Sequence, residues 1–421
     1  MDAYRTALER NDPDVYAAIV GEEDRQRRGV ELIPSENYTY PEVLAALGTV
    51  LTNKYSEGYP GRRYYGGQQY TDQIETIARQ RACALFRAEH ANVQPLSGSA
   101  MNQAAYLACL QPGDTVLAMD LSHGGHLTHG APVSHMGRLF NFVRYKTQHN
   151  RQGAIDYDAL MAAAREARPK LVLCGFSSYP RELDYAAFRR IADAVGALAM
   201  ADIAHIGGLV AAGVLRNPLD DGFDIVTTTV HKSLRGPRAG LILCRAAHAK
   251  AIDASVFPGL QGGPHMHTIA ATAVALRKAA EPAFQDYARQ VLANAQALAT
   301  ALLSAGVSLV TGGTDNHLLV LNTIDSFGLD GRQAEELLDR IGITANKQVV
   351  PDDPRPPLRP SGLRIGTPAA TTRGMREADM RAIAGWMVDA LRHPTDDARL
   401  ARLADDARSF CRHFPLPGVA S

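Results

Sequence analysis

Two short apolar runs, each leading into polar residues, constrain the fold of this 421-residue chain more than any other feature. Residues 198–201 lead into Asp202, and the β-rich run 223–228 comes just before His231 and Lys232. Runs this short and apolar predict strands of a buried parallel sheet. Ligands of such sheets bind beyond the carboxyl ends of the strands, so we expect Asp202 and Lys232 to face one crevice.

A carboxylate and a lysine at such strand ends are the pair that pyridoxal phosphate (PLP) requires. PLP accepts electrons only while its pyridine nitrogen stays protonated, which needs a fixed carboxylate, and a lysine amine stores it as a Schiff base. Asp202 and Lys232 fit these two tasks. The alternative is that Asp202 caps the next element and Lys232 is a surface lysine. Among the lysines of the chain, only Lys232 follows a predicted strand beside a histidine.

Charge and cysteine content exclude several classes of function. The 44 basic and 44 acidic residues cancel, so neither nucleic acid nor an anionic membrane is expected as a partner. The 5 cysteines are scattered and form no C-x-x-C pair, which predicts reduced thiols and a cytoplasmic location. The most apolar window, residues 191–215, contains Asp193, Asp202 and His205, and the charged N-terminus shows no signal peptide. We therefore expect no membrane span.

The pattern along the chain divides it into residues 1–30, 31–281 and 282–421. The first part has helical composition and is expected to form an arm. In the second part, strand-like and helix-like segments alternate from residue 92 onward, which predicts a mostly parallel, doubly wound α/β domain that binds PLP. The third part is predicted to be a smaller α+β domain. Its expected elements are a helix over 284–304, a strand at 318–321, a proline-rich loop at 351–360 and helices after Glu377.

The segment between residues 31 and 70 differs from both neighbours. It is rich in Gly, Pro, Tyr and Asn and has little periodicity, so we expect a long loop. Loops of this length in a compact domain are usually functional or part of an interface.

Two glycine-rich turns are candidates for binding the cofactor phosphate. Ser97, Gly98 and Ser99 precede an apolar helical pattern, and a helix N-terminus offers free N–H groups to a phosphate. Serine and glycine are equally typical of an ordinary helix cap, so the motif alone is weak. The turn at 257–264 could approach a phosphate, and its composition fits a plain loop as well.

Histidines and one arginine complete the candidate chemistry. His123, His126 and His129 are spaced by three, but no carboxylate or cysteine nearby completes a tetrahedral metal site, so no metal is expected. One of these imidazoles is better used stacked on the pyridine ring. Arg364 stands beside strand-like residues and two glycines, which suits bidentate binding of an amino acid carboxylate. The alternative for Arg364 is a solvated surface arginine.

Taken together, these motifs resemble the serine hydroxymethyltransferase family of fold-type I PLP enzymes, from about Glu31 to Trp386. The motifs that carry the resemblance are Ser35 to Tyr38, Leu51 to Tyr55, Glu57 to Gly61, Arg63 to Gly67, His123 to Gly130, Gly312 to His317 and Arg364 to Pro368. The resemblance implies an enzyme that makes or breaks the Cα–Cβ bond of a serine-type amino acid and passes the one-carbon unit to tetrahydrofolate. It also implies a homodimer or tetramer whose active sites lie at the dimer interface.

The resemblance further implies a role for each matching residue. Lys232 holds PLP, Asp202 binds the pyridine nitrogen, and His126 stacks on the ring. Glu57 moves a proton to or from the hydroxymethyl oxygen or a folate nitrogen. The other implied contacts are with the phosphate (Ser97, Gly98, Ser99, His231), the ring hydroxyl (Ser177, His205), the substrate (Ser35, Tyr65, Arg364) and folate (Glu57, Tyr64, Leu121, Gly125, Leu127, Gln348). Tyr55, Glu57, Tyr64, Tyr65, Gly262 and Gly263 arrive from the neighbouring subunit.

Several positions depart from the family pattern. Leu96 replaces a histidine, Ala100-Met101 replaces Gln-Ala, Val230 replaces a threonine, Gly207 replaces an alanine and Gln348 replaces an asparagine. Lost polar groups and lost volume suit a bulkier, apolar substituent on Cα, such as the methyl of 2-methylserine, which would be cleaved to D-alanine. One buried methyl shifts preference by only about 1–3 kcal/mol, so serine/glycine and 2-methylserine/D-alanine both stay open.

Other functions are less compatible with the sequence. A folate-independent aldolase or transaldolase of β-hydroxy amino acids is the closest alternative. A nicotinamide dehydrogenase would carry G-x-G-x-x-G after its first strand, which is missing here. An RNA-binding role has no basic patch to support it.

Overall fold

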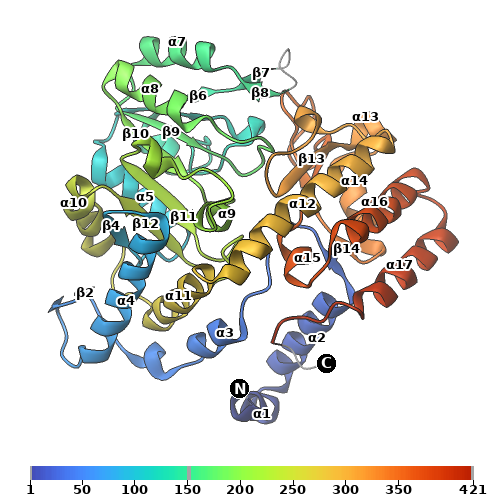
Figure 1. Ribbon diagram of the computed structural model, residues 1–421, viewed down its shortest axis with the longest axis horizontal. Helices are drawn as coiled ribbons and strands as arrows, with labels where there is room; N and C mark the ends of the chain where they lie inside the picture. The colour runs from blue at the N-terminus through green and yellow to red at the C-terminus, as the bar shows by residue number, and fades with distance from the viewer. Residues whose placement is uncertain (1, 149–152, 419–421) are drawn as a thin grey trace.

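A seven-stranded sheet lies at the centre of the larger part of the protein (Figure 1). The structure is a computed structural model that describes residues 2–148 and 153–418. Across the sheet the strands are β4 (His90–Asn92), β12 (Gly240–Cys244), β11 (Ile225–Thr229), β10 (Leu198–Asp202), β9 (Leu171–Gly175), β5 (Thr115–Met119) and β6 (Asn141–Tyr145). Within this sheet β12 runs antiparallel to both of its neighbours, and the pairs from β11 to β6 are all parallel.

Helices bury both faces of this sheet. One face packs against α4 (Gln69–Phe86), α7 (Tyr157–Ala167), α8 (Tyr185–Val195), α9 (Gly207–Ala211) and α11 (Met266–Ala279), and the other against α5 (Gly98–Cys109), α6 (Met136–Leu139) and α10 (Ala249–Ala254). Side chains alternate between the two cores along each strand: Leu117 and Met119 enter the first, Val116 and Ala118 the second. Because both faces are buried, the strands are continuous apolar runs.

Helix α8, which joins β9 to β10, illustrates how the local sequence sets these elements. Asp184 caps its first turn by accepting the Ala187 N–H at 2.9 Å, and Gly196 ends it with a φ of 68°. Tyr185, Phe188 and Ile191 recur at helical spacing and are buried on the sheet. A Phe188→Ala change would leave a cavity and cost about 3–5 kcal/mol of stability.

The C-terminal part has its own sheet and core. Its three strands lie in the order β13 (Leu318–Asn322), β16 (Gly362–Gly366) and β15 (Asn346–Gln348), all antiparallel. The helices around them are α13 (Thr323–Phe327), α14 (Gly331–Arg340), α15 (Pro368–Thr372), α16 (Glu377–Arg392) and α17 (Asp397–Cys411). The predicted strand at 318–321 and the helices after Glu377 are therefore confirmed.

A long helix, α12 (Pro282–Ser304), connects the two parts (Figure 1). Phe284 and Val291 near its start belong to the core beside the large sheet, and Leu298 and Leu302 near its end belong to the C-terminal core. Pro282 opens the helix at a position where its missing N–H costs nothing. The predicted helix over 284–304 is confirmed, and it belongs to both cores.

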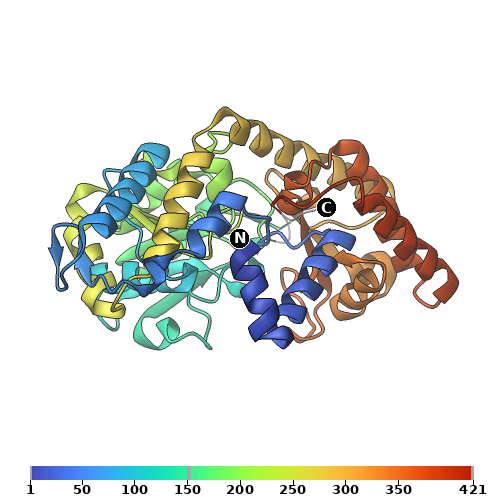
Figure 2. The ribbon, with the colours of Figure 1, turned by 90° about the horizontal axis from the view of Figure 1, so that it is seen from below.

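Helix α2 (Pro13–Arg28) packs against α17 of the C-terminal part (Figures 1 and 2), and α1 (Asp2–Asn11) packs against α2. Strand β1 (Val30–Glu31) pairs in parallel with β14 (Ile343–Thr344). The Arg373 guanidinium donates to the carbonyl oxygens of Gly29 at 2.7 Å and Cys411 at 3.0 Å, which joins the arm to α17. The division into residues 1–30, 31–281 and 282–421 stays our proposal.

The segment from residue 31 to 70 is more regular than the sequence indicated. It contains α3 (Pro41–Leu47) and the short antiparallel pair of β2 (Gly58–Tyr59) and β3 (Arg62–Arg63). Helix α3 starts with a proline at a favourable position and buries Val43 in the core, packing against α11. Seven helical residues are too few to show a periodic pattern. A further short pair is formed by β7 (Thr147–Gln148) and β8 (Ala154–Ile155).

None of the helices in the described part of the chain has both the length and the apolar character needed to span a bilayer.

Candidate active site

Strands β10 and β11 lie where the sequence predicted two strands, and they are adjacent and parallel. Asp202 pairs in register with Thr227, so both strands end at the same edge of the sheet. Asp202, the last residue of β10, is 6% exposed. Beyond β11 the chain turns at once into His231 and Lys232, and the Lys232 ammonium interacts electrostatically with the Asp202 carboxylate. The two candidate residues thus meet at one crevice.

Three polar contacts fix the Asp202 carboxylate. Its Oδ2 accepts a hydrogen bond from Asn102 Nδ2 at 2.8 Å and lies 3.0 Å from His129 Nε2. Its Oδ1 accepts the Ala204 N–H at 3.0 Å. Burial opposes ionisation, but the hydrogen bonds with His129 and Asn102 outweigh it and hold the pKa of Asp202 well below its ordinary range. The site therefore keeps a charged, oriented carboxylate, as a protonated pyridine nitrogen requires.

A pocket of about 440 Å³ opens beside Lys232. The predicted residues that line it are Ser35, Leu121, Gly125, His126, Leu127, Ser177, His205, His231, Lys232, Gln348 and Arg364. Glu36, Ser178 and Arg238 line it as well and were not predicted. The pocket walls come from segments far apart in the sequence, including the C-terminal part, which supplies Gln348 and Arg364.

Burial changes the proton affinities of the groups in this pocket. It lowers the pKa of Lys232 to about 8 against the attraction of Asp202, and Arg364 adds to the lowering. It also lowers the pKa of His126 to about 4 and that of His231 to about 3, so both rings are neutral at pH 7. A lysine whose amine is partly neutral near pH 7 is a competent nucleophile.

Arg364 reaches into the pocket from β16 and ties the two parts of the protein together. Its Nη1 donates to the Ser177 carbonyl oxygen at 2.6 Å, and its Nε donates to Asn346 Oδ1 at 3.1 Å. Burial lowers the pKa of Arg364 to about 10, which still leaves the guanidinium charged at neutral pH. A half-buried, oriented guanidinium that lines the pocket is suited to a carboxylate ligand.

These groups fit PLP. Lys232 supplies an amine, Asp202 a fixed carboxylate, and His126 an uncharged ring in the same pocket. His231 Nδ1 is buried and has no hydrogen-bond partner in the described part of the chain, so it is available to a ligand oxygen.

The serine-glycine turn lies at the start of α5, next to the end of β11. Ser97 Oγ accepts the Ala100 N–H at 3.2 Å, so the ordinary cap interaction is present. A Cβ on Gly98 would lie 3.0 Å from the Thr229 methyl group, which brings the start of the helix close to the last residue of β11. Binding of a phosphate by Ser97, Gly98 and Ser99 stays a prediction.

A second group of predicted residues does not line the Lys232 pocket of this chain. The rings of Tyr55 and Tyr65 lie 5.1 Å apart. A Cβ on Gly262 would lie 3.1 Å from Glu57 Oε1, and one on Gly263 would lie 3.1 Å from the Tyr55 ring. Tyr64 is 75% exposed and Tyr55 55% exposed. The structure thus collects Tyr55, Glu57, Tyr64, Tyr65, Gly262 and Gly263 into a separate surface group, which we call the Glu57 loop group.

Several residues of the site were missed from the sequence. Asn102 holds Asp202 and also accepts the Thr227 hydroxyl at 2.8 Å. The His317 ring stacks on His205 with centroids 5.6 Å apart. An asparagine inside an apolar helical pattern was a usable signal for Asn102, since a buried amide needs partners. His317 belongs to one of the motifs that resemble the family, but the sequence did not predict that its ring contacts His205.

The three closely spaced histidines make different contacts. His129 binds Asp202, His126 Nδ1 lies 2.7 Å from Thr128 Oγ1, and His123 Nδ1 lies 2.9 Å from Thr147 Oγ1. In residues 2–148 and 153–418 no group of three or more His, Cys, Asp or Glu side chains could hold a metal ion.

The departures from the family pattern lie in different surroundings. Gln348 lines the pocket, whereas Val230 is fully buried in the core and Leu96 is 41% exposed. The expectation that Gly207 leaves extra volume for a substrate is wrong. A Cβ there would lie only 2.1 Å from Thr228 Oγ1, so the threonine side chain already fills this space.

A parallel sheet with one reversed strand, whose strand ends carry a fixed aspartate and a lysine of lowered pKa, defines a PLP-dependent enzyme of fold-type I. The family model for serine hydroxymethyltransferase matches residues 8–387. The chain belongs to this family. It is therefore a hydroxymethyltransferase of one-carbon and amino-acid metabolism, with PLP as cofactor and tetrahydrofolate as co-substrate.

Similar proteins match along the whole chain. Identity to the serine hydroxymethyltransferase of Acidobacterium capsulatum is 52% over 417 residues, which cover 99% of this chain and 97% of that protein. Identity to the Sorangium cellulosum protein of the same name is 53% over 413 residues, with 98% and 97% covered. For that of Xanthomonas axonopodis pv. citri it is 52% over 416 residues, with 98% of each covered.

Proposed function

We propose that this protein transfers the hydroxymethyl group of a serine-type amino acid reversibly to tetrahydrofolate, in a site completed by a second copy of the chain. The observation that carries the proposal is the pocket that brings Lys232, His126 and Arg364 together beside the fixed Asp202 carboxylate. The amine can hold the cofactor, the carboxylate can keep its nitrogen protonated, and the guanidinium can bind the substrate carboxylate.

Arg364 and Ser35 are the proposed ligands of the substrate carboxylate. Arg364 is half-buried and held by the Ser177 carbonyl oxygen and Asn346, so its orientation is set before substrate arrives. Fixing the carboxylate fixes the rotation about the bond from nitrogen to Cα, and thereby selects which bond of Cα is broken. Bound PLP supplies an electron sink for the pair released from that bond.

Proton transfer is assigned to groups on both sides of the site. Lys232, with its lowered pKa, can exchange a proton near Cα. Glu57 can move a proton at the hydroxymethyl oxygen or a folate nitrogen, and Tyr65 is the second catalytic residue proposed for this side of the site. His126 is neutral, so it can lie against the cofactor ring without opposing the positive charge that Asp202 maintains.

The remaining proposed contacts concern cofactor and folate. We assign Ser97, Gly98, Ser99 and His231 to the phosphate, and Ser177 and His205 to the ring hydroxyl. Leu121, Gly125, Leu127 and Gln348 line the pocket, and Leu121 and Leu127 are 39% and 50% exposed. These exposed leucines offer an apolar surface for the folate pterin to cover.

The Glu57 loop group is proposed to act in the site of the neighbouring subunit. Tyr55, Tyr64 and Tyr65 are large apolar rings exposed on one surface, which is typical of residues that a partner covers. Tyr55, Gly262 and Gly263 would contact the cofactor there, and Glu57, Tyr64 and Tyr65 the folate and the substrate. The protein would then be a homodimer, or a tetramer of such dimers, and we place it in the cytoplasm because its 5 cysteines are free.

The amino acid substrate is either serine, with glycine as product, or 2-methylserine, with D-alanine as product. Loss of polarity at Leu96 and Val230 favours the methylated substrate, whereas Thr228 occupying the space at Gly207 favours the ordinary one. The test compares folate-dependent turnover of L-serine and 2-methylserine by the same enzyme. Turnover of either identifies the substrate, and no turnover of both would overturn the proposal.

A parallel reaction without folate distinguishes the aldolase alternative. A folate-dependent enzyme loses formation of glycine or D-alanine when folate is omitted. An unchanged rate without folate would assign the protein to the folate-independent aldolases instead.

A further inference from the structure

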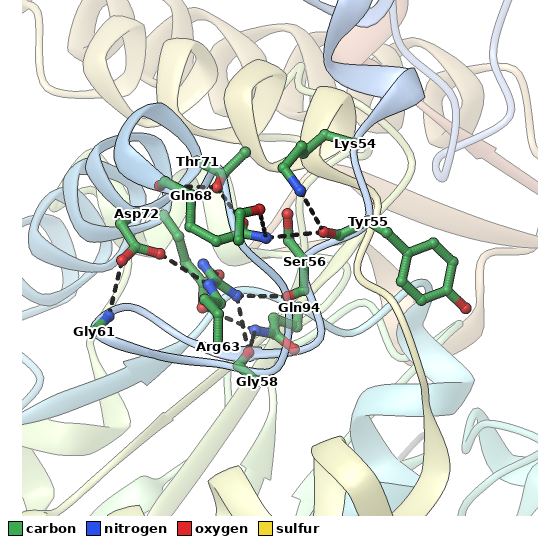
Figure 3. Close-up of polar contacts among 12 residues, drawn as sticks. Lys54, Tyr55, Ser56, Gly58, Gly61, Arg63, Gln68, Thr71, Asp72 and Gln94 are labelled. Carbon is green, nitrogen blue, oxygen red and sulfur yellow. Dashed lines mark hydrogen bonds and ion pairs between the residues drawn. The ribbon is translucent and has the colours of Figure 1, made fainter.

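Arg63 lies directly behind the loop that carries Glu57 (Figure 3). Its side chain is 3% exposed, and it binds two carboxylates: Nε donates to Asp72 Oδ1 at 2.9 Å and Nη2 donates to Glu75 Oε2 at 2.6 Å. Burying an ion pair costs about as much as its attraction returns, so this arrangement adds little stability over a well-packed apolar one. The distinctive effect of Arg63 is on the backbone that it holds.

The third nitrogen of the guanidinium holds the backbone on both sides of Glu57. Nη1 donates to the carbonyl oxygens of Ser56 at 2.8 Å and Gly58 at 2.9 Å. Gln94 Nε2 donates to the same Gly58 oxygen at 2.9 Å and to Glu75 Oε1 at 2.9 Å. The Ser56–Glu57 and Gly58–Tyr59 peptide groups are therefore tied to one planar group, and Figure 3 shows the bonds to Ser56 and Gly58. They restrain the Glu57 backbone that lies between them.

Further hydrogen bonds hold the ends of this loop. Gln68 Nε2 donates to the Tyr55 carbonyl oxygen at 2.9 Å, and the Tyr64 N–H donates to the Glu57 carbonyl oxygen at 3.1 Å. Gly58 has a φ of 96°, and a Cβ on it would lie 2.3 Å from the Arg62 carbonyl oxygen, so only glycine lets the two strands close here. Hydrogen bonds therefore fix the backbone conformation of the loop from Tyr55 to Tyr64.

The side chains of Tyr55 and Glu57 contact the glycine-rich turn at 257–264 instead of this framework. Glu57 Oε1 lies against Gly262, and the Tyr55 ring lies against Gly263. Glu75, in contrast, is buried, and its pKa is raised by burial despite the attraction of Arg63. The charged framework faces inward and the candidate catalytic groups face outward, with the Glu57 backbone between them.

We propose that Arg63, together with Glu75 and Gln94, is a positioning unit that fixes Glu57 for proton transfer. The inference rests on the role proposed above for Glu57. Arg63 touches no reacting atom, so it acts only through the backbone that it holds. A displacement of about 1 Å in a catalytic group can reduce a rate by about 100-fold, which is the size of effect that such a unit controls.

The test uses Arg63→Lys, with Arg62→Lys as the matched control. Lysine keeps the charge but cannot reach both carbonyl oxygens and both carboxylates at once. Arg62 is the neighbouring arginine on β3 and is exposed. Amide hydrogen exchange in the apoprotein should show faster exchange of residues 56–64 in Arg63→Lys and no change in Arg62→Lys. Equal exchange in the two variants would overturn the proposal.

A double-mutant comparison separates positioning from a general structural effect. Arg63→Lys should lower kcat about 10- to 100-fold with little change in the KM for the amino acid, and Glu57→Gln should lower kcat as well. If Arg63 acts through Glu57, the double variant is no slower than Glu57→Gln. Multiplication of the two effects would show that Arg63 acts elsewhere, and the proposal would fail.

Two further measurements test the proposal if Arg63→Lys does not fold or if Glu57→Gln keeps its activity. If Arg63→Lys does not fold, Gln94→Met removes the bonds to the Gly58 carbonyl oxygen and to Glu75 Oε1 and leaves the ion pairs of Arg63. It should show the same two effects at smaller size. If Glu57→Gln has full activity, the proposed role of Glu57 fails while the exchange measurement still reports on the framework. The failure of each idea is thus seen separately.

Discussion

The pocket around Lys232 and the Glu57 loop group are built in opposite ways. In the pocket, Asp202 is buried and oriented by Asn102 and His129 of the same chain. The half-buried Arg364 is likewise held within the chain, by Asn346 and the Ser177 carbonyl oxygen. In the Glu57 loop group, aromatic rings are exposed, and Tyr64 is 75% exposed. The backbone of that group is held by Arg63, which donates hydrogen bonds to the carbonyl oxygens of Ser56 and Gly58.

One chain alone assembles the pocket around Lys232, whereas it exposes the Glu57 loop group on its surface for another subunit. The pocket around Lys232 has its carboxylate, amine and guanidinium in place without help. The loop group has a fixed backbone and outward side chains with nothing of this chain to act on. Such a division is expected of a site shared between subunits, because each chain prepares two half-sites with different parts of its surface.

Removal of the Lys232 amine tests the first region most severely. Lys232→Ala should reduce turnover by about 10³-fold or more, because the cofactor then has no covalent attachment and the proton carrier is lost. The variant should also lose the visible absorbance that borohydride abolishes in the unaltered enzyme. Circular dichroism should be unchanged, since alanine fits the space of lysine. A yellow, active variant would contradict the assignment of Lys232.

Mixing two inactive variants tests whether the regions work across subunits. Lys232→Ala has intact loops and Glu57→Gln has intact pockets, so mixed dimers contain one complete site. After unfolding and refolding together in equal amounts, activity should return to roughly a quarter of that of the unaltered protein. Each variant refolded alone is the control. No recovery in the mixture would place Glu57 and Lys232 in the same chain's site.

The support of Asp202 predicts a smaller effect. Asn102→Leu removes one donor to the carboxylate, so the pKa of Asp202 should rise and the acidic limb of the pH profile of kcat should move to higher pH. We expect kcat to fall about tenfold, equivalent to about 1.4 kcal/mol. Asn141→Ala, which removes an exposed amide bonded to Thr115, is the control. Identical profiles for the two variants would show that Asn102 is dispensable.

The lowered pKa of Lys232 predicts how the apoprotein takes up its cofactor. The neutral amine is the nucleophile, so the rate of PLP capture should rise about tenfold per pH unit below pH 8 and level off above it, since the pKa is about 8. Absorbance after stopped-flow mixing measures this rate. A midpoint near pH 10 would mean that burial does not act on Lys232 as described.

The smallest expected effect on chemistry is at Gly207. Gly207→Ala forces a methyl group against Thr228 and should cost about 1–3 kcal/mol of stability, partly recovered by adding Thr228→Ala. The ratio of activities on L-serine and 2-methylserine should stay unchanged, because the new methyl group points into the core. A changed ratio would show that this position reaches the substrate.

The sequence predicted the elements whose signals are local. Asp202 and Lys232 were found because strands end where apolar runs end, and α12 because its pattern continues for six turns. Helix α3 was missed because seven residues show little periodicity, and its position depends on contact with α11.

The missing parts of the site are those that depend on tertiary contact. His129 and Asp202 are 73 residues apart, and no local pattern records that they meet. The bond from Arg63 to Glu75 belongs to the same class, since both residues are ordinary for their segments. The error at Gly207 also has this origin: a missing methyl group indicates space only if no neighbour, here Thr228, has taken it.

Helix α12 has a mechanical consequence. Its 23 residues form a rod about 35 Å long, embedded at one end in each core. Any swing of the C-terminal part must therefore bend this rod, and it would carry Arg364 away from Ser177 at the same time. The stiffness of this helix therefore opposes widening of the mouth of the carboxylate site. The bonds of Arg181 to Asp315 and of Arg364 to Ser177 oppose it as well.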